Sequence, residues 1–165
     1  QVAPNKYFFQ ASIQQTVLYP LTADKRLVLS GWYNIGMSPG VGKSVLPMDR
    51  RYYAGGVGTV RGFGSQMAGP LSSAGKPLGG NSMMAFGTEL IYHLNQDLSV
   101  IGFVDAGSTY SSNYPNFAHR LFVGIGGGVK YKTAIGDIHV DVAFPVNRRP
   151  EDQKAQIYFG IDQPF

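Results

Sequence analysis

The sequence predicts an all-β fold, an antiparallel β-barrel whose strands cross a membrane. Seven segments alternate between apolar residues and small or polar ones with a period of two, the pattern of strands with one apolar face. Most of these segments reach the roughly 9–11 residues that a tilted strand needs to span a bilayer. Short connections alternate with long ones, as expected when all the short turns lie on one side of a membrane.

The predicted strands cover residues 7–19, 26–36, 82–94, 98–110, 121–132, 137–144 and 156–165. In the sixth, every second residue from Ile138 to Phe144 is apolar, and the residues between them include His139 and Asp141. A soluble β-sandwich would also alternate in this way. Two observations favour the membrane barrel. The predicted strands are longer than the usual length of about 5–6 residues, and Tyr and Phe recur near their ends.

The composition supports a β-protein with closely packed faces. The 165 residues form one domain at most, or part of one, and include 22 glycines, 10 tyrosines and 10 phenylalanines with only 15% charged residues. A net charge of +4 without a basic stripe among stacking aromatics excludes nucleic acid as an expected partner. The absence of cysteine excludes thiolate metal sites and disulfide bonds. No apolar run is long enough for a transmembrane helix, and the first residues do not form a signal peptide.

The longest connection, residues 37–81, shows neither strand nor helix periodicity. It far exceeds the ~12–15 residues beyond which structureless loops become uncommon, so it is either functional or disordered. Apolar side chains such as Tyr52, Phe63 and Leu71 argue against disorder. Its glycines let the backbone approach a wall closely, and Arg61 lies at its centre. We therefore predict a lid loop folded into the barrel lumen, with Arg61 as its polar anchor.

The sequence contains no pattern that predicts catalysis or metal binding. His139 and Asp141 share a face, but same-face neighbours lie about 6.6 Å apart along a strand, so we expect no direct bond between them. The histidines His93, His119 and His139 lie on separate segments without ligand spacing. We therefore expect no enzymatic activity, no metal and no cofactor.

Specific motifs run through nearly the whole chain. They are YYAGG at residues 52–56, the VRGF core of Val60, Arg61, Gly62 and Phe63, LGGN at 78–81, FVDAG at 103–107, GDIHVDVAFP at 136–145 and NRRP at 147–150. With these motifs the chain resembles the C-terminal barrel half of the outer-membrane assembly and translocation proteins, the BamA/TamA superfamily. The tail from residue 140 onward is more similar to the TamA branch, the translocation and assembly module subunit. One departure is Phe63, where many members of that branch carry Tyr.

The resemblance implies a sixteen-stranded barrel in the bacterial outer membrane, preceded by periplasmic polypeptide-transport-associated domains. Residues 1–165 would supply its last seven strands. The implied function is protein translocation and assembly: insertion or secretion of outer-membrane proteins such as autotransporters through a lateral seam. The implied partners are the outer-membrane lipid bilayer, unfolded client proteins and a periplasm-spanning inner-membrane protein of the TamB type. Seven strands leave two unpaired edges, so an isolated fragment would have to self-associate or recruit a strand to close.

For Arg61 the resemblance implies two carboxylate partners. Period-two counting places Glu89 and Asp105 on the lumenal faces of neighbouring strands, and a guanidinium can bind a carboxylate on each. In the family the loop arginine contacts acidic residues of these two strands, which would lock the lid inside the barrel. The alternative is that Arg61 is a solvated loop cation and that the two carboxylates are unrelated lumenal charges.

The last predicted strand carries a second expectation, through Tyr158, Gly160 and Phe165. A terminal Phe is typical of bacterial outer-membrane barrels and is read by the barrel assembly machinery. In the superfamily the first and last strands form a weak seam, and Gly160 and Pro164 would weaken it further by giving up packing and a hydrogen-bond donor. A client strand could then pair with the exposed edge. The alternative is that both are ordinary strand-end residues.

Two other functions remain open. One is a general outer-membrane protein insertase of the same superfamily. The other is a passive pore whose long loop constricts the channel. A pore does not require the VRGF core or carboxylates placed to receive Arg61, and a constriction usually needs several opposed charges.

Overall fold

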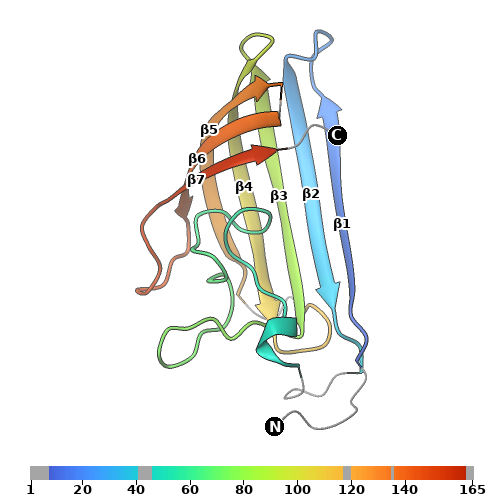
Figure 1. Ribbon diagram of the computed structural model, residues 1–165, viewed down its shortest axis with the longest axis vertical. Coiled ribbons are helices and arrows are strands. Elements are labelled where there is room, and N and C mark those ends of the chain that lie inside the picture. Colours follow the sequence, from blue (N-terminus) through green and yellow to red (C-terminus); the bar gives the residue numbers. More distant parts are fainter. Residues whose placement is uncertain (1–7, 41–45, 117–119, 135, 163–165) are drawn as a thin grey trace.

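The computed structural model describes residues 8–40, 46–116, 120–134 and 136–162, and its strands form a single antiparallel sheet (Figure 1). Each strand pairs with the next one in the chain. The strands are β1 (Ala11–Pro20), β2 (Leu27–Met37), β3 (Ser82–His93), β4 (Leu98–Tyr110), β5 (Phe122–Thr133), β6 (Gly136–Pro145) and β7 (Gln156–Asp162). A single turn of 3-10 helix, η1 (Met48–Arg50), lies in the long connection after β2.

The predicted antiparallel all-β sheet of seven strands is confirmed, with corrections at the strand ends. β1 begins at Ala11 and not at residue 7, because Ala11 pairs with Met37, the last residue of β2. Met37 therefore belongs to a strand, and the long connection, for which we keep the name lid, comprises residues 38–81. The other ends shift by one residue or not at all, except that β7 is described only as far as Asp162. Phe165, the predicted terminal signal, lies outside the described residues.

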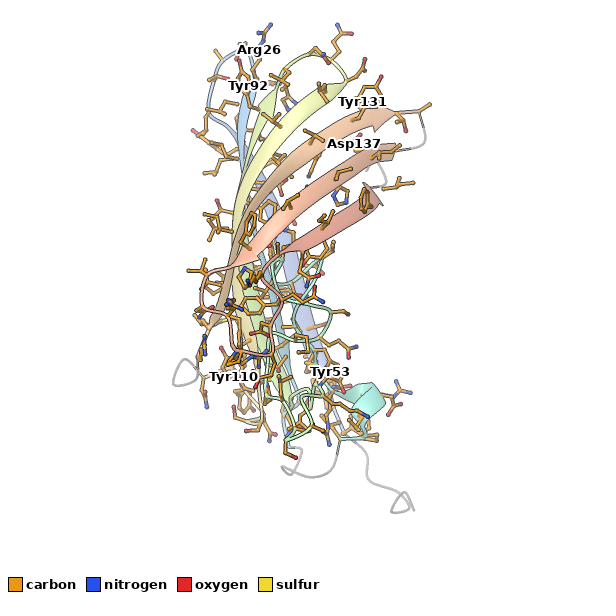
Figure 2. The ribbon with its side chains drawn as sticks, turned by 90° about the vertical axis from the view of Figure 1, so that its left-hand side faces the viewer. Arg26, Tyr53, Tyr92, Tyr110, Tyr131 and Asp137 are labelled. Carbon is orange, nitrogen blue, oxygen red and sulfur yellow. The ribbon has the colours of Figure 1, made fainter. Side chains whose placement is uncertain are left out.

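Short turns gather at one end of the sheet and long connections at the other (Figure 1). Figure 2 marks the short-turn end by Arg26, Tyr92, Tyr131 and Asp137, and the opposite end by Tyr53 and Tyr110. The turn between β3 and β4 is tight because the side chain of Asn95 accepts hydrogen bonds from the backbone N–H groups of Asp97 and Leu98, at 2.9 and 2.8 Å.

The two faces of the sheet have opposite environments. One face exposes large apolar side chains from every strand; on β5, β6 and β7 these include Tyr131 (52% exposed), Phe144 (51%) and Phe159 (77%). Alternate residues on the other face, such as Phe103 and Asp105, are buried. Apolar exposure on this scale suits lipid surroundings. Throughout the described residues, no helix has the length and apolar character needed to cross a membrane.

The lid supplies the apolar core on the inner face. It lies over the half of the sheet nearest the long-loop end (Figure 1). Val60 and Phe63 are fully buried, and the Phe63 ring meets that of Phe122 on β5 edge to face, with centroids 5.2 Å apart. Burying an apolar side chain of this size stabilises the packed state by roughly 1.5–3 kcal/mol. At the base of the lid, the Tyr52 hydroxyl donates to the carbonyls of Ala11 and Met37, which attaches the loop to β1 and β2.

Candidate functional site

A tight turn in the lid presents Arg61 to the sheet. The turn is closed by a hydrogen bond from the Gly56 N–H to the Val60 carbonyl (3.0 Å). Gly62 follows with a φ of +98°, a conformation that favours glycine. A Cβ there would also lie 2.9 Å from the backbone carbon of Phe144 on β6. The VRGF core therefore brings backbone against the wall of the sheet, as its glycine content allows.

The Arg61 guanidinium binds carboxylates on two neighbouring strands. Its Nε and Nη2 donate to the two oxygens of Asp105 on β4, at 2.7 and 3.0 Å, and the Arg61 backbone N–H adds a bond of 3.2 Å. Its Nη1 donates to Glu89 on β3 at 3.0 Å. Both carboxylates are buried, and the Asp105 side chain is only 1% exposed. The structure thus places Arg61, Glu89 and Asp105 in direct contact. The alternative, a solvated Arg61, would have no contact with these carboxylates.

Three further side chains complete this cluster and were not identified from the sequence. Asp141 on β6 brings an oxygen to 3.7 Å from Arg61 Nη1. The Arg61 guanidinium carbon lies over the Phe103 ring at 3.3 Å from the centroid, a cation–π contact. Lys130 on β5 donates to the second oxygen of Glu89 at 2.8 Å. Two cations and three carboxylates are therefore held close to one another on the inner face of the sheet.

Glycines on β5 explain how Asp141 comes within reach of the lid. β5 lies between β4 and β6, and its inward positions include Gly124, Gly126 and Gly128. A Cβ on Gly124 would overlap the Arg61 carbonyl oxygen, and one on Gly128 would overlap the Asp141 carboxylate. Because these positions carry no side chain, groups from β4, β6 and the lid meet above β5.

His139 and Asp141 contact each other, so the expectation that they lie too far apart is wrong. His139 Nδ1 lies 3.0 Å from Asp141 Oδ2. A carboxylate only accepts hydrogen bonds, so Nδ1 carries the proton in this contact. The spacing of about 6.6 Å refers to backbone positions two residues apart. Both side chains are long enough to lean toward each other along the strand, which shortens that separation.

Tyr158 and Gly160 lie on the inward face of β7. The Tyr158 hydroxyl accepts a hydrogen bond from the Gly62 N–H (2.9 Å) and donates one to the Phe63 carbonyl (3.0 Å). Gly160 pairs with His139, whose ring occupies the space that a Cβ on Gly160 would fill. Tyr158 and Gly160, two of the three predicted terminal-strand residues, thus face the lid and the charged cluster.

Comparison with known proteins identifies the family of this barrel. A model of the Omp85 superfamily domain matches residues 2–165. The chain belongs to the Omp85 superfamily. It is therefore part of a β-barrel protein of the bacterial outer membrane, with its apolar face toward lipid.

Two relatives of this chain are outer membrane protein assembly factors named BamA. The one from Neisseria meningitidis is 26% identical over 96% of this chain, and the one from Nitratidesulfovibrio vulgaris is 27% identical over 75% of it. The chain spans only 24% and 16% of their lengths. The crystal structure of BamA from Haemophilus ducreyi lacking POTRA domains 1–3 shares the fold, with a TM-score of 0.75 and 21% identity over 92% of this chain and 34% of that one.

A second arginine of this Omp85 chain binds the lid from the connection between β6 and β7. Arg149 donates to the backbone carbonyls of Gly69 (2.7 Å) and Met67 in the lid. Its guanidinium carbon lies 4.6 Å from the centroid of the Phe122 ring. Its Nε and Nη2 pair with the two oxygens of Asp152, at 3.0 and 2.9 Å. The NRRP motif contains this arginine, but nothing in the sequence points to the lid carbonyls as its partners.

Asp152 is a buried carboxylate outside the strands. Its side chain is 1% exposed, and this burial acts to raise the pKa of Asp152. Hydrogen bonds from the Arg149 guanidinium and backbone N–H outweigh burial, so the pKa of Asp152 lies below its ordinary value of 3.8. The carboxylate is therefore ionised at neutral pH and keeps Arg149 oriented toward the lid.

The inner face has the features of an attachment site for the long loop. Among the residues described, no three His, Asp or Glu side chains are grouped as metal ligands. Arg61 binds Asp105, and Lys130 binds Glu89, so these carboxylates are engaged by cations of the chain itself. What this arrangement can do is hold a long loop at a fixed place on the inner face.

Proposed function

We propose that this chain is the C-terminal part of a sixteen-stranded outer-membrane barrel that helps client proteins enter or cross the outer membrane through a lateral seam. Residues 38–81 would act as a lid inside the lumen, locked by the VRGF core. In this proposal Val60 and Phe63 supply packing, Gly62 allows the close turn, and Arg61 supplies the charge that Glu89 and Asp105 bind.

The observation that supports this function most is the attachment of the lid to strands far from its own ends. Arg61 contacts β3, β4 and β6. A lid fixed in this way would preserve the arrangement of the strands at the inner face while the seam opens. A client segment could then add to the edge of β7 at the opened seam through backbone hydrogen bonds. Such a mechanism requires binding and no chemical step, so we propose no enzymatic activity.

The proposed clients are autotransporters and related outer-membrane proteins, as in the TamA branch. The support is the similarity of the tail from residue 140 onward to that branch. The proposal includes polypeptide-transport-associated domains before the barrel and a TamB-like partner from the inner membrane. The second candidate is a general insertase, and the observation in its favour is that the relatives described above are BamA proteins.

Depletion of the full-length protein in its own bacterium separates these functions. We expect autotransporters to be lost from the outer membrane while most other barrels persist, as quantified by proteomics of purified outer membranes. Loss of nearly all barrel proteins together with arrest of growth would favour the general insertase. Unchanged levels of both classes, with altered uptake of small solutes, would favour a passive pore and overturn the proposal.

A cross-linking experiment tests the position of the lid. The described chain has no cysteine, so Arg61→Cys with Asp105→Cys introduces a unique pair into the full-length protein, after replacement of any cysteine elsewhere in it. A short bifunctional thiol reagent applied to intact outer membranes should join them. The matched control is Val57→Cys with Asp105→Cys, since Val57 is a lid residue with 58% of its surface exposed. Ready labelling of both Arg61→Cys and Asp105→Cys from outside, without cross-linking, would contradict a lumenal lid.

A further inference from the structure

Tyr158 joins the terminal strand to the lid through both of its hydrogen-bonding functions. Its hydroxyl receives the Gly62 N–H and binds the Phe63 carbonyl, two adjacent backbone groups of the VRGF core. Its ring packs beside the buried cluster of Ile101, Phe103 and Ala143. Phe63 is fully buried, so its carbonyl has little access to water as a substitute partner.

β7 has a short described backbone ladder. Its described part comprises 7 residues, whereas β3 has 12 and β4 has 13. Within the described part of the chain, β7 pairs only with β6. The two Tyr158 bonds are therefore a substantial addition to the backbone ladder that keeps β7 at the inner face. They are made to the lid and not to the neighbouring strand.

We propose that Tyr158 couples the position of the lid to the position of β7. β7 cannot move outward from the inner face without breaking the bonds to Gly62 and Phe63. A lid that withdraws from the inner face leaves Tyr158 without these partners and loosens β7. Coupling between two sites is reciprocal, so loosening either element must loosen the other. The use of this coupling during client insertion rests on the proposed function, whereas the coupling itself concerns only contacts within this chain.

Hydrogen exchange measured by mass spectrometry on the full-length barrel tests the coupling. Tyr158→Phe keeps the ring and removes the hydroxyl. We expect amide exchange to become about five- to tenfold faster both in residues 60–64 of the lid and in residues 156–162 of β7, because two hydrogen bonds are lost. The matched control is Tyr33→Phe, which removes a hydroxyl bound to Gln15 at 2.7 Å on the outer face. This control should leave both segments unchanged.

A second variant tests reciprocity and does not depend on the folding of Tyr158→Phe. Arg61→Lys disturbs the lid at its contacts with β3 and β4, and it should speed exchange in β7 when Tyr158 is present. In Tyr158→Phe this additional effect on β7 should disappear. The proposal is overturned if Tyr158→Phe alters only one of the two segments or neither. It is also overturned if Arg61→Lys leaves β7 unchanged, or loosens β7 equally with and without the hydroxyl. No client protein is present, so this result is independent of whether the barrel inserts proteins.

Discussion

Two arginines attach the lid to the sheet, and they reach it from opposite directions. Arg61 belongs to the lid and extends into the sheet, where it meets carboxylates on the strands. Arg149 belongs to the connection between β6 and β7 and extends into the lid, where it meets two backbone carbonyls. Each guanidinium lies over an aromatic ring, Phe103 for Arg61 and Phe122 for Arg149.

The two attachments differ in what remains when the arginine is removed. Asp105 receives three hydrogen bonds from Arg61 and is almost completely buried, so without Arg61 it becomes a buried carboxylate that has lost the cation bound to it. Breaking a buried ion pair in this way costs about 3–5 kcal/mol. Removing the Arg149 side chain also takes the guanidinium from Asp152, but that carboxylate keeps the backbone N–H of residue 149 and the nearby charge of Arg120. The lid itself loses only hydrogen bonds to neutral carbonyls, and these cost less. The Arg61 attachment should therefore determine whether the lid docks on the sheet. The Arg149 attachment should determine how tightly residues 67–69 of the docked lid are held.

Arg61→Ala should have the largest effect, because it leaves Asp105 buried without its cation. We expect docking of the lid to weaken by about 3–5 kcal/mol and residues 46–81 to become sensitive to protease in the folded full-length barrel. Arg26→Ala is the matched control, since the Arg26 side chain is 62% exposed and lies in a short turn. Equal protease resistance of the lid in the parent and in Arg61→Ala would contradict the dominance of this attachment.

Gly124→Ala tests the same attachment without removing a charge. The added methyl group would overlap the Arg61 carbonyl, so the VRGF core must move away from the sheet. Overpacking of this kind typically costs about 1–3 kcal/mol. Gly102→Ala on β4 is the control, because a Cβ there meets nothing within 4 Å. The measurement is thermal unfolding. It is monitored by electrophoresis, because the folded and the unfolded barrel migrate differently in a gel. Equal melting temperatures for Gly124→Ala and Gly102→Ala would argue against close packing of the lid on β5.

Arg149→Ala should have a smaller effect than Arg61→Ala, and a more local one. The lid loses its bonds at Gly69 and Met67 while the Arg61 attachment remains. Loss of charged hydrogen bonds of this kind costs about 1.5–3 kcal/mol. Hydrogen exchange should rise in residues 66–70 but not in residues 60–63. The neighbouring Arg148, which is exposed, provides the control variant Arg148→Ala. Faster exchange across the whole lid would show that the two attachments are not separable.

Acid should produce the smallest effect, through Asp152. Its pKa is lowered in the folded protein, so its stabilising contribution is complete above the ordinary pKa of 3.8 and is lost as pH falls through the lower folded value. We therefore expect residues 66–70 to loosen only below about pH 4, as followed by a fluorescent label near residue 67. Asp152→Asn should already be loosened at neutral pH and should lose this acid-dependent step. A transition of the same size in Asp152→Asn would assign it to another group.

The sheet was predictable because strand alternation is a local property of the chain. The period of two sets which side chains share a face, and Asn95 encodes a tight turn within three residues of itself. The same counting, combined with the family resemblance, placed Glu89 and Asp105 on the inner face where Arg61 meets them. Strand ends were less predictable: β1 starts at Ala11 because β2 ends at Met37, which is a property of pairing and not of either segment alone.

The rest of the site depended on which strands lie across from one another. The sequence by itself determined the two faces of each strand, the length of the lid and the glycine in its VRGF core. Only the tertiary structure brought Asp141 and Tyr158 to the lid, placed Lys130 beside Glu89 and directed Arg149 to lid carbonyls. These contacts join residues on non-adjacent strands or loops, and they form above the glycines of β5. Such contacts depend on sheet curvature and on the register of several strands at once, and no local pattern encodes these.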